Sequence, residues 1–261
     1  MTALPRLIAF DLDDTLAPSK SPLRPQMAEL LVRLLDRTEV CVISGGQFGQ
    51  FDAQVIQQLA GATAEQLERL HLMPTCGTQY YRYADAEWEQ VYAQNLTESE
   101  RDEALAVVEA EARALGFWEA ETWGPILEDR GSQVTFSALG QAAPVEAKMQ
   151  WDPSGAKKNA LRDAVQVKLP LLEVRSGGST SIDITRRGID KAYGMTRLAD
   201  VSGVPLEEML FIGDRLDENG NDYPVKVLGV ECVAVEGWEH TVTLLERMLD
   251  SSAPRSAAMT A

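Results

Sequence analysis

Three carboxylates follow a short apolar run near the N-terminus. Leu7–Phe10 is typical of a buried strand, and Asp11, Asp13 and Asp14 come directly after it. Side chains two residues apart in an extended segment point the same way, so Asp11 and Asp13 could face one site. Clustered ionised carboxylates are costly at the end of a buried strand, and a bound cation is the usual compensation. The segment therefore predicts a Mg²⁺-assisted site with Asp11 as nucleophile. An acidic turn that caps a strand is the alternative.

Other candidate residues stand where predicted strands end or where a helix begins. They are Ser44 after Val40–Ile43, Asp214 with Asn221 and Asp222 after Met209–Ile212, and Lys191 at a helix start. Sites in open parallel sheets form outside the carboxyl ends of the strands, so we expect these residues to converge. Taken singly, each has a simpler interpretation: a turn or N-cap serine, a solvated lysine, and a surface loop or noncatalytic cation loop. The acidic loop does not fit the EF-hand template, because Asn219 and Val225 occupy the positions that require Gly and Glu.

The elements that would position these residues alternate between strands and helices in the two end regions of the chain, which favours parallel βαβ units. Between them the pattern changes to hairpins and two helices. The first hairpin is predicted at Tyr80–Tyr83 and Trp88–Tyr92, and the first helix opens at Thr97, which has capping-box spacing to Glu100. We predict an α/β fold in which a Rossmann-like parallel-sheet core domain, residues 1–81 and 186–261, carries an inserted α+β domain at 82–185.

Composition limits the partners. The 261 residues carry a formal net charge of −16, which argues against nonspecific binding to nucleic acid or to an anionic membrane. Cys41 and Cys232 lie in apolar runs, so reduced buried thiols are expected. No apolar run approaches the length that spans a bilayer, and 1–6 lacks the apolar region of a secretory signal. A cytoplasmic location is the expectation, with a disordered tail at 251–261.

Four motifs together resemble the haloacid dehalogenase superfamily of phosphotransferases. They are DLDDT, ISG, the lysine of GIDKAYG, and GDRLDENGND, and they occur in the order of that superfamily. The resemblance implies that Asp11 is the nucleophile and a Mg²⁺ ligand, and that it forms an aspartyl-phosphate. Asp13 would offer a backbone carbonyl to the metal and a side-chain general acid/base. The remaining implied roles are phosphoryl binding by Ser44, Gly45 and Lys191, metal binding by Asp214, and support from Asn221 and Asp222.

The insert resembles the larger cap, type IIB, of eukaryotic-type phosphomannomutases. The matching segments are Arg130–Ser132, Phe136–Gly140 and Gly177–Asp183. In that family the cap binds the sugar and its non-reacting phosphate. By position, the resemblance implies substrate binding by Arg130, Ser181 and Asp183, each of which could instead be a structural turn or strand residue.

Two departures from that family bear on the reaction. Gln141 stands where the family has a phosphate-gripping Arg, and Lys20 replaces a core-domain Arg. Gln carries no charge, and Lys lacks the planar bidentate fork. A mutase must hold a second phosphate, whereas a phosphatase needs one phosphate site and water. The sequence therefore favours a Mg²⁺-dependent sugar phosphatase. A phosphomannomutase is the alternative, and a noncatalytic sugar-phosphate- or cation-binding protein is the third interpretation.

The expected partner is a small phosphorylated sugar, with neither nucleic acid nor membrane. Trp88 and Tyr92 offer a face of the insert for a homodimer, or else they pack in its core.

Overall fold

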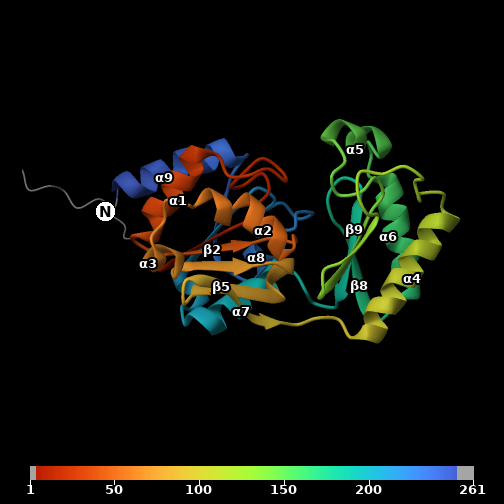
Figure 1. The fold of residues 1–261 in the computed structure, drawn as a ribbon, viewed down its shortest axis with the longest axis horizontal. Helices are drawn as coiled ribbons and strands as arrows, with labels where there is room; N and C mark the ends of the chain where they lie inside the picture. The colour runs from red at the N-terminus through yellow and green to blue at the C-terminus, as the bar shows by residue number, and fades with distance from the viewer. Residues whose placement is uncertain (1–3, 252–261) are drawn as a thin grey trace, which may run out of the picture. The chain divides into compact units, whose positions relative to one another are not determined.

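The computed structural model describes residues 4–251 and divides the chain into two compact units (Figure 1). The first unit comprises Met1–Tyr92 and Asp190–Ala261, and the second, which we call the insert, comprises Ala93–Ile189. An α/β core interrupted by an α+β insert agrees with the predicted fold class. The predicted tail falls almost entirely outside the described residues.

A mixed sheet forms the centre of the first unit. It has seven strands in the order β11-β10-β1-β2-β3-β4-β5. Strands β11 to β3 run parallel, and β4 pairs antiparallel with β3. The strands are β1 (Leu7–Phe10), β2 (Glu39–Ile43), β3 (Leu70–Met73), β4 (Gln79–Ala84), β5 (Glu87–Ala93), β10 (Met209–Gly213) and β11 (Glu231–Ala234).

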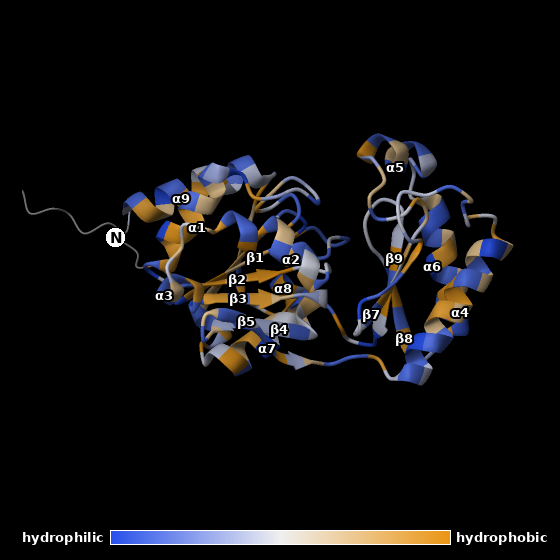
Figure 2. Ribbon diagram, in the orientation of Figure 1, coloured by the Kyte–Doolittle hydropathy of each residue, from blue (hydrophilic) through white to orange (hydrophobic). Residues whose placement is uncertain are grey.

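Helices cover both faces of this sheet (Figure 1). Ile8 and Phe10 face a core closed by α1 and α9, while Leu7 and Ala9 face a second core closed by α7 and α8. Because both faces are covered, the central strands are mostly apolar, and Figure 2 shows them as largely hydrophobic ribbons. The helices are α1 (Pro25–Leu35), α2 (Phe48–Gln54), α3 (Ala64–Leu67), α7 (Lys191–Ser202), α8 (Tyr223–Val227) and α9 (Trp238–Ser251), with short 3-10 helices η1 (Ile56–Gln58), η2 (Thr75–Gly77) and η3 (Leu206–Glu208).

The insert is a four-stranded antiparallel sheet with helices packed on one face. The strand order is β6-β7-β9-β8, and α4 and α6 cover the face that carries Phe136 and Ile182. The predicted capping box is confirmed, since Thr97 and Glu100 each accept a hydrogen bond from the other's backbone N–H. The elements are β6 (Leu127–Asp129), β7 (Gln133–Ser137), β8 (Leu172–Ser176), β9 (Ser181–Arg186), α4 (Glu98–Ala114), α5 (Val145–Trp151) and α6 (Ala156–Lys168).

The first hairpin corrects the predicted boundary of the insert. The prediction placed residues from 82 onward in the insert, but β4 and β5 extend the sheet of the first unit. Tyr81 stacks on Phe48 of α2 with ring centroids 3.9 Å apart, and the Tyr92 hydroxyl donates to Gly77 O at 2.8 Å. Trp88 and Tyr92 pack against the two cores of the first unit, so their predicted place in the insert, on a face or in its core, is wrong.

Two short helices, α5 and α8, were not predicted. Cys41 is buried as expected, and burial raises the pKa of its thiol, but Cys232 is only partly buried. Within residues 4–251, no helix combines the length and the apolar character needed to cross a membrane.

Candidate active site

A buried lysine joins two carboxylates at the carboxyl end of the parallel sheet. Asp11 follows β1, and its backbone N–H donates to Ile212 O of β10 at 3.0 Å. Lys191 is the first residue of α7, and its Nζ donates to Asp11 Oδ1 and, at 2.5 Å, to Asp222 Oδ1. Asp11 is 4% exposed, Lys191 1% and Asp222 0%. A buried lysine with two charge-assisted partners is a fixed part of the site, which excludes the solvated lysine considered from sequence.

Two features of α7 hold Lys191 in place: the N-cap of the helix, and close packing of the helix against the segment at Gly77 and the end of β2. The Asp190 side chain accepts a hydrogen bond from Tyr193 N at 3.0 Å and fixes the first turn. One residue further on, Gly194 packs against Gly77, and a Cβ on Gly194 would overlap Ile43 Cδ1. A residue without a side chain therefore lets α7 approach the end of β2.

Asp214 completes an acidic group around Asp11. One carboxylate oxygen from each of Asp11, Asp214 and Asp222 lies within 4.8 Å of the other two. Asp214 follows β10 and accepts from Thr15 Oγ1 at 3.3 Å, while Asp222 Oδ2 accepts from Arg215 N at 3.1 Å. Three convergent carboxylates form a donor set that suits Mg²⁺.

Burial and like charge favour a cation at this group. Burial raises the pKa of Asp11 above its usual value, and Lys191 opposes the rise. Burial alone would lower the pKa of Lys191, but Asp11 and Asp222 outweigh burial and raise it. Burial and the Asp222 charge raise the pKa of Asp214. If all three carboxylates are ionised, one ammonium leaves an excess of negative charge, which a bound divalent cation would balance.

Tight turns shape the acidic loop. A Cβ on Gly213 would overlap the Asp222 carboxylate, and a Cβ on Gly220 would overlap Arg215 O. Both positions therefore need glycine if the loop is to bring the Asp222 carboxylate close to Asp214. Asn221 lies exposed on the same loop.

Ser44 and Gly45 follow β2, the neighbour of β1 in the sheet. Ser44 is buried, its Oγ accepts from Gly46 N at 3.2 Å, and its carbonyl accepts from Cys76 N at 2.9 Å. The parallel pairing of β1 with β2 places Ser44 at the same sheet end as Asp11.

Asp13 makes its hydrogen bonds with residues outside the three-carboxylate group. Its Oδ1 accepts from Lys20 N at 2.6 Å and from Gln54 Nε2 at 3.4 Å, and its Oδ2 accepts from Gln50 Nε2 at 3.2 Å. Lys20 thus contacts Asp13 through its backbone, while its side chain is exposed. Sequence reasoning missed the two glutamines. Their spacing, one helical turn apart just after the Ser-Gly-Gly segment, was the available signal.

The candidate residues of the insert gather on the sheet face that is opposite α4 and α6. Asp183 Oδ1 accepts from Thr135 Oγ1 at 2.7 Å and from Gln133 Nε2 at 2.8 Å. Arg130 donates to Glu128 at 2.7 Å. The alternation of β7 and β9 turns these polar residues away from the core of the insert.

Gln141 and Ser181 both neighbour Ser137 on the same polar face of the insert sheet. Gln141 Nε2 donates to Ser137 Oγ at 2.6 Å, and Ser137 pairs with Ser181 in the register of β7 and β9. The insert residues named from sequence thus belong to one surface of the insert.

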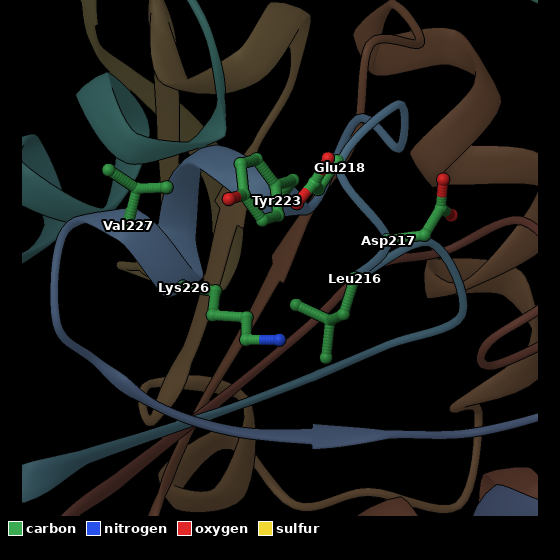
Figure 3. Close-up of a pocket in the computed structure, with 6 residues that line it drawn as sticks. All are labelled: Leu216, Asp217, Glu218, Tyr223, Lys226 and Val227. Carbon is green, nitrogen blue, oxygen red and sulfur yellow. The ribbon is translucent and has the colours of Figure 1, made fainter.

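A surface hollow lies beside the acidic loop (Figure 3). Tyr223, Lys226 and Val227 of α8 line it, together with the loop segment Leu216–Glu218. Neither the nucleophile candidate Asp11 nor Lys191 lines this hollow.

Comparison with known proteins identifies the family. The family model for eukaryotic phosphomannomutase matches residues 27–250. Human phosphomannomutase 1 is 23% identical over 226 residues, covering 84% of this chain and 82% of that protein. A probable phosphomannomutase of Caenorhabditis elegans is 24% identical over 256 residues, covering 93% of this chain and 95% of that protein.

Solved structures share the fold. A haloacid dehalogenase-like hydrolase from Bacteroides thetaiotaomicron superposes with a TM-score of 0.62 at 17% identity, covering 94% of this chain and 99% of that one. An N-terminally truncated IMP-nucleotidase of Plasmodium falciparum superposes with a TM-score of 0.69 at 12% identity, covering 96% of this chain and 71% of that one. The family match spans most of the sequence and both units, so the chain belongs to the eukaryotic phosphomannomutase family of the haloacid dehalogenase superfamily.

Proposed function

We propose that the protein transfers a phosphoryl group from a hexose phosphate through a covalent phosphate on Asp11. The observation that carries this proposal is the buried contact of Lys191 with Asp11 and Asp222, at a sheet end where Asp214 also converges. A nucleophilic carboxylate needs nearby positive charge to approach an anionic phosphate, and this arrangement provides a fixed ammonium and a cation-binding donor set.

The residues divide the work by position. Asp11 Oδ attacks phosphorus, the bond from phosphorus to the sugar oxygen breaks, and Asp13 gives its proton to that oxygen. An acceptor hydroxyl then attacks the phosphoryl group on Asp11 and loses its proton to Asp13, which restores both carboxyl groups. Ser44, the Gly45 backbone and Lys191 hold the phosphoryl oxygens. Mg²⁺, held by Asp11, Asp214 and the Asp13 carbonyl, would screen the negative charge of the phosphate.

We assign the acceptor first to a hexose hydroxyl, so that the reaction interconverts hexose 1- and 6-phosphates. The support is the family match over 27–250 and the names of the curated relatives. These favour the mutase alternative over the hydrolysis that the sequence analysis preferred.

Hydrolysis of a sugar phosphate is the second candidate, and the polar face of the insert favours it. Arg130 is paired with Glu128 at 2.7 Å and Arg175 with Glu173 at 2.8 Å, so a phosphate would compete with a carboxylate for each guanidinium. Gln141 adds no charge. A second phosphate dianion needs uncompensated cations, whereas a sugar bound by its hydroxyls does not.

The test follows phosphate release and isomer conversion from mannose and glucose 1- and 6-phosphates, with Mg²⁺, with and without a hexose 1,6-bisphosphate. Conversion without release supports the mutase, and release without conversion supports hydrolysis. If neither phosphate release nor isomer conversion is detected with any of these substrates, the proposed phosphoryl transfer is overturned.

Gln141 offers a matched pair of variants for the same assay. Gln141→Arg adds a cation to the polar face, whereas Gln141→Met changes the side chain at similar size without adding charge. If the missing charge limits mutase activity, Gln141→Arg raises the ratio of conversion to release and Gln141→Met does not. Equal ratios in the two variants would show that charge at residue 141 does not choose the acceptor.

A further inference from the structure

We propose that Gln50 of α2 is a positioning residue that orients the Asp13 carboxylate for proton transfer. The inference rests on the proposed function, because it assigns a supporting residue to the general acid/base of that reaction.

Three donors form hydrogen bonds to the Asp13 carboxylate. Gln50 Nε2 donates to Oδ2 at 3.2 Å, while Lys20 N and Gln54 Nε2 donate to Oδ1 at 2.6 and 3.4 Å. Gln50 thus donates to Oδ2, whereas the Lys20 backbone and Gln54 donate to Oδ1. With one oxygen fixed by the backbone and the other by Gln50, the carboxylate plane is set.

The local fold is built to place Gln50 there. Gln50 and Gln54 are four residues apart on α2, so both amides project from the same helix face. Gln54 is 3% exposed and is held by a second bond, from its Nε2 to Ser21 O at 2.7 Å. A Cβ on Gly46 would overlap Gln50 Oε1, so the glycine provides the room that the amide occupies.

Orientation matters because Asp13 must serve two oxygens. It gives a proton to the departing sugar oxygen and then takes one from the acceptor hydroxyl. A misplacement of about 1 Å costs on the order of a hundredfold in rate. A neutral amide fixes the carboxylate without adding a charge, whereas a lysine or arginine at this position would tie Asp13 into an ion pair.

The test compares two leaving groups in the Mg²⁺-loaded full-length enzyme. A sugar oxygen is strongly basic and needs Asp13's proton to depart, whereas the nitrophenolate of p-nitrophenyl phosphate departs without one. In single-turnover measurements of the first step, we expect Gln50→Met to lower the rate of phosphoryl transfer from hexose phosphate to Asp11 by about 10-fold or more, and the rate of the nitrophenolate burst from p-nitrophenyl phosphate by less than about 3-fold.

Gln57→Met is the matched control. Gln57 makes a surface bond of the same type, from its Nε2 to Asp52 Oδ2 at 2.9 Å, and this variant should keep both activities. Thermal melts show whether each variant is folded. Gln50→Glu keeps the size of the side chain, sets a carboxylate against Asp13, and should show the same selective loss if the methionine variant unfolds.

Equal losses for the two leaving groups, or no loss for either, in a folded Gln50 variant would overturn the positioning role while leaving the proposed function intact. A wild-type enzyme that turns over neither substrate would instead overturn the proposed function, and the role of Gln50 with it.

Discussion

Replacement of Lys191 by methionine tests whether its ammonium holds the buried site together. Methionine keeps most of the volume but leaves Asp11 and Asp222, 4% and 0% exposed, with no cation between them. Removal of one partner from a buried ion pair costs about 3–5 kcal/mol. For a protein of this size each kcal/mol lowers Tm by about 2–4 °C, so we expect Lys191→Met to lower Tm by about 6–20 °C.

The assay is thermal unfolding at neutral pH with a chelator present, so that no bound cation replaces the ammonium. A double-mutant cycle with Asp222→Asn isolates the cause. Asp222→Asn alone should lower the free energy of unfolding by less than Lys191→Met does, because Lys191 remains paired with Asp11. The double variant should be more stable than the sum of the two losses predicts, by about 1–3 kcal/mol, because one uncompensated carboxylate has been removed. Lys226→Met, at an exposed lysine, should leave Tm within about 2 °C.

Two results would refute this reasoning. A Tm of Lys191→Met equal to that of Lys226→Met would mean that the buried carboxylates do not depend on the ammonium. Strict additivity in the cycle would mean that Lys191 and Asp222 do not interact energetically.

Three further outcomes are expected. Asp11→Asn should abolish substrate-dependent phosphate transfer while retaining a folded melt, since an amide is not a nucleophile toward phosphorus; turnover at the wild-type rate would refute the mechanism. Gly194→Ala should lower stability by about 1–3 kcal/mol, because the added methyl overlaps Ile43, whereas Gly49→Ala, with open space around it, should not destabilise in denaturant titrations. Burial lowers the pKa of His71 below its ordinary value of 6.5. The unfolded chain therefore binds a proton at a higher pH than the folded protein does. As a result, the free energy of unfolding should fall as the pH drops below about 6.5. His71→Gln should reduce that fall in Tm measured against pH, and the exposed His240→Gln should not.

Much of the first unit could be predicted because its signals are local. An apolar run followed by carboxylates marks Leu7–Phe10 as a buried strand with Asp11 at its end, and parallel strands bring such ends together without further information. The capping box at Thr97 likewise depends only on neighbouring residues. The motif order then identified the superfamily, which the comparisons support.

Contacts between distant segments needed the tertiary structure. The Tyr80–Tyr92 hairpin has the same alternation in either unit, and only its pairing with β3 decides that it belongs to the first. Spacing also could not show that Lys191 is sealed between Asp11 and Asp222, which are 180 and 31 residues away along the chain.

The sequence by itself was enough to predict phosphoryl-transfer chemistry, because the carboxylates, the serine and the lysine at its strand ends and helix start match the motifs of the superfamily in order. The tertiary structure decided which side chains support that chemistry. Gln50 contacts Asp13 only because α2 packs beside the turn that follows β1. The absence of a side chain at Gly194 is needed only because α7 packs against Gly77. Hydrogen bonds and steric exclusion depend on distances of a few ångströms between segments that the sequence pattern does not relate.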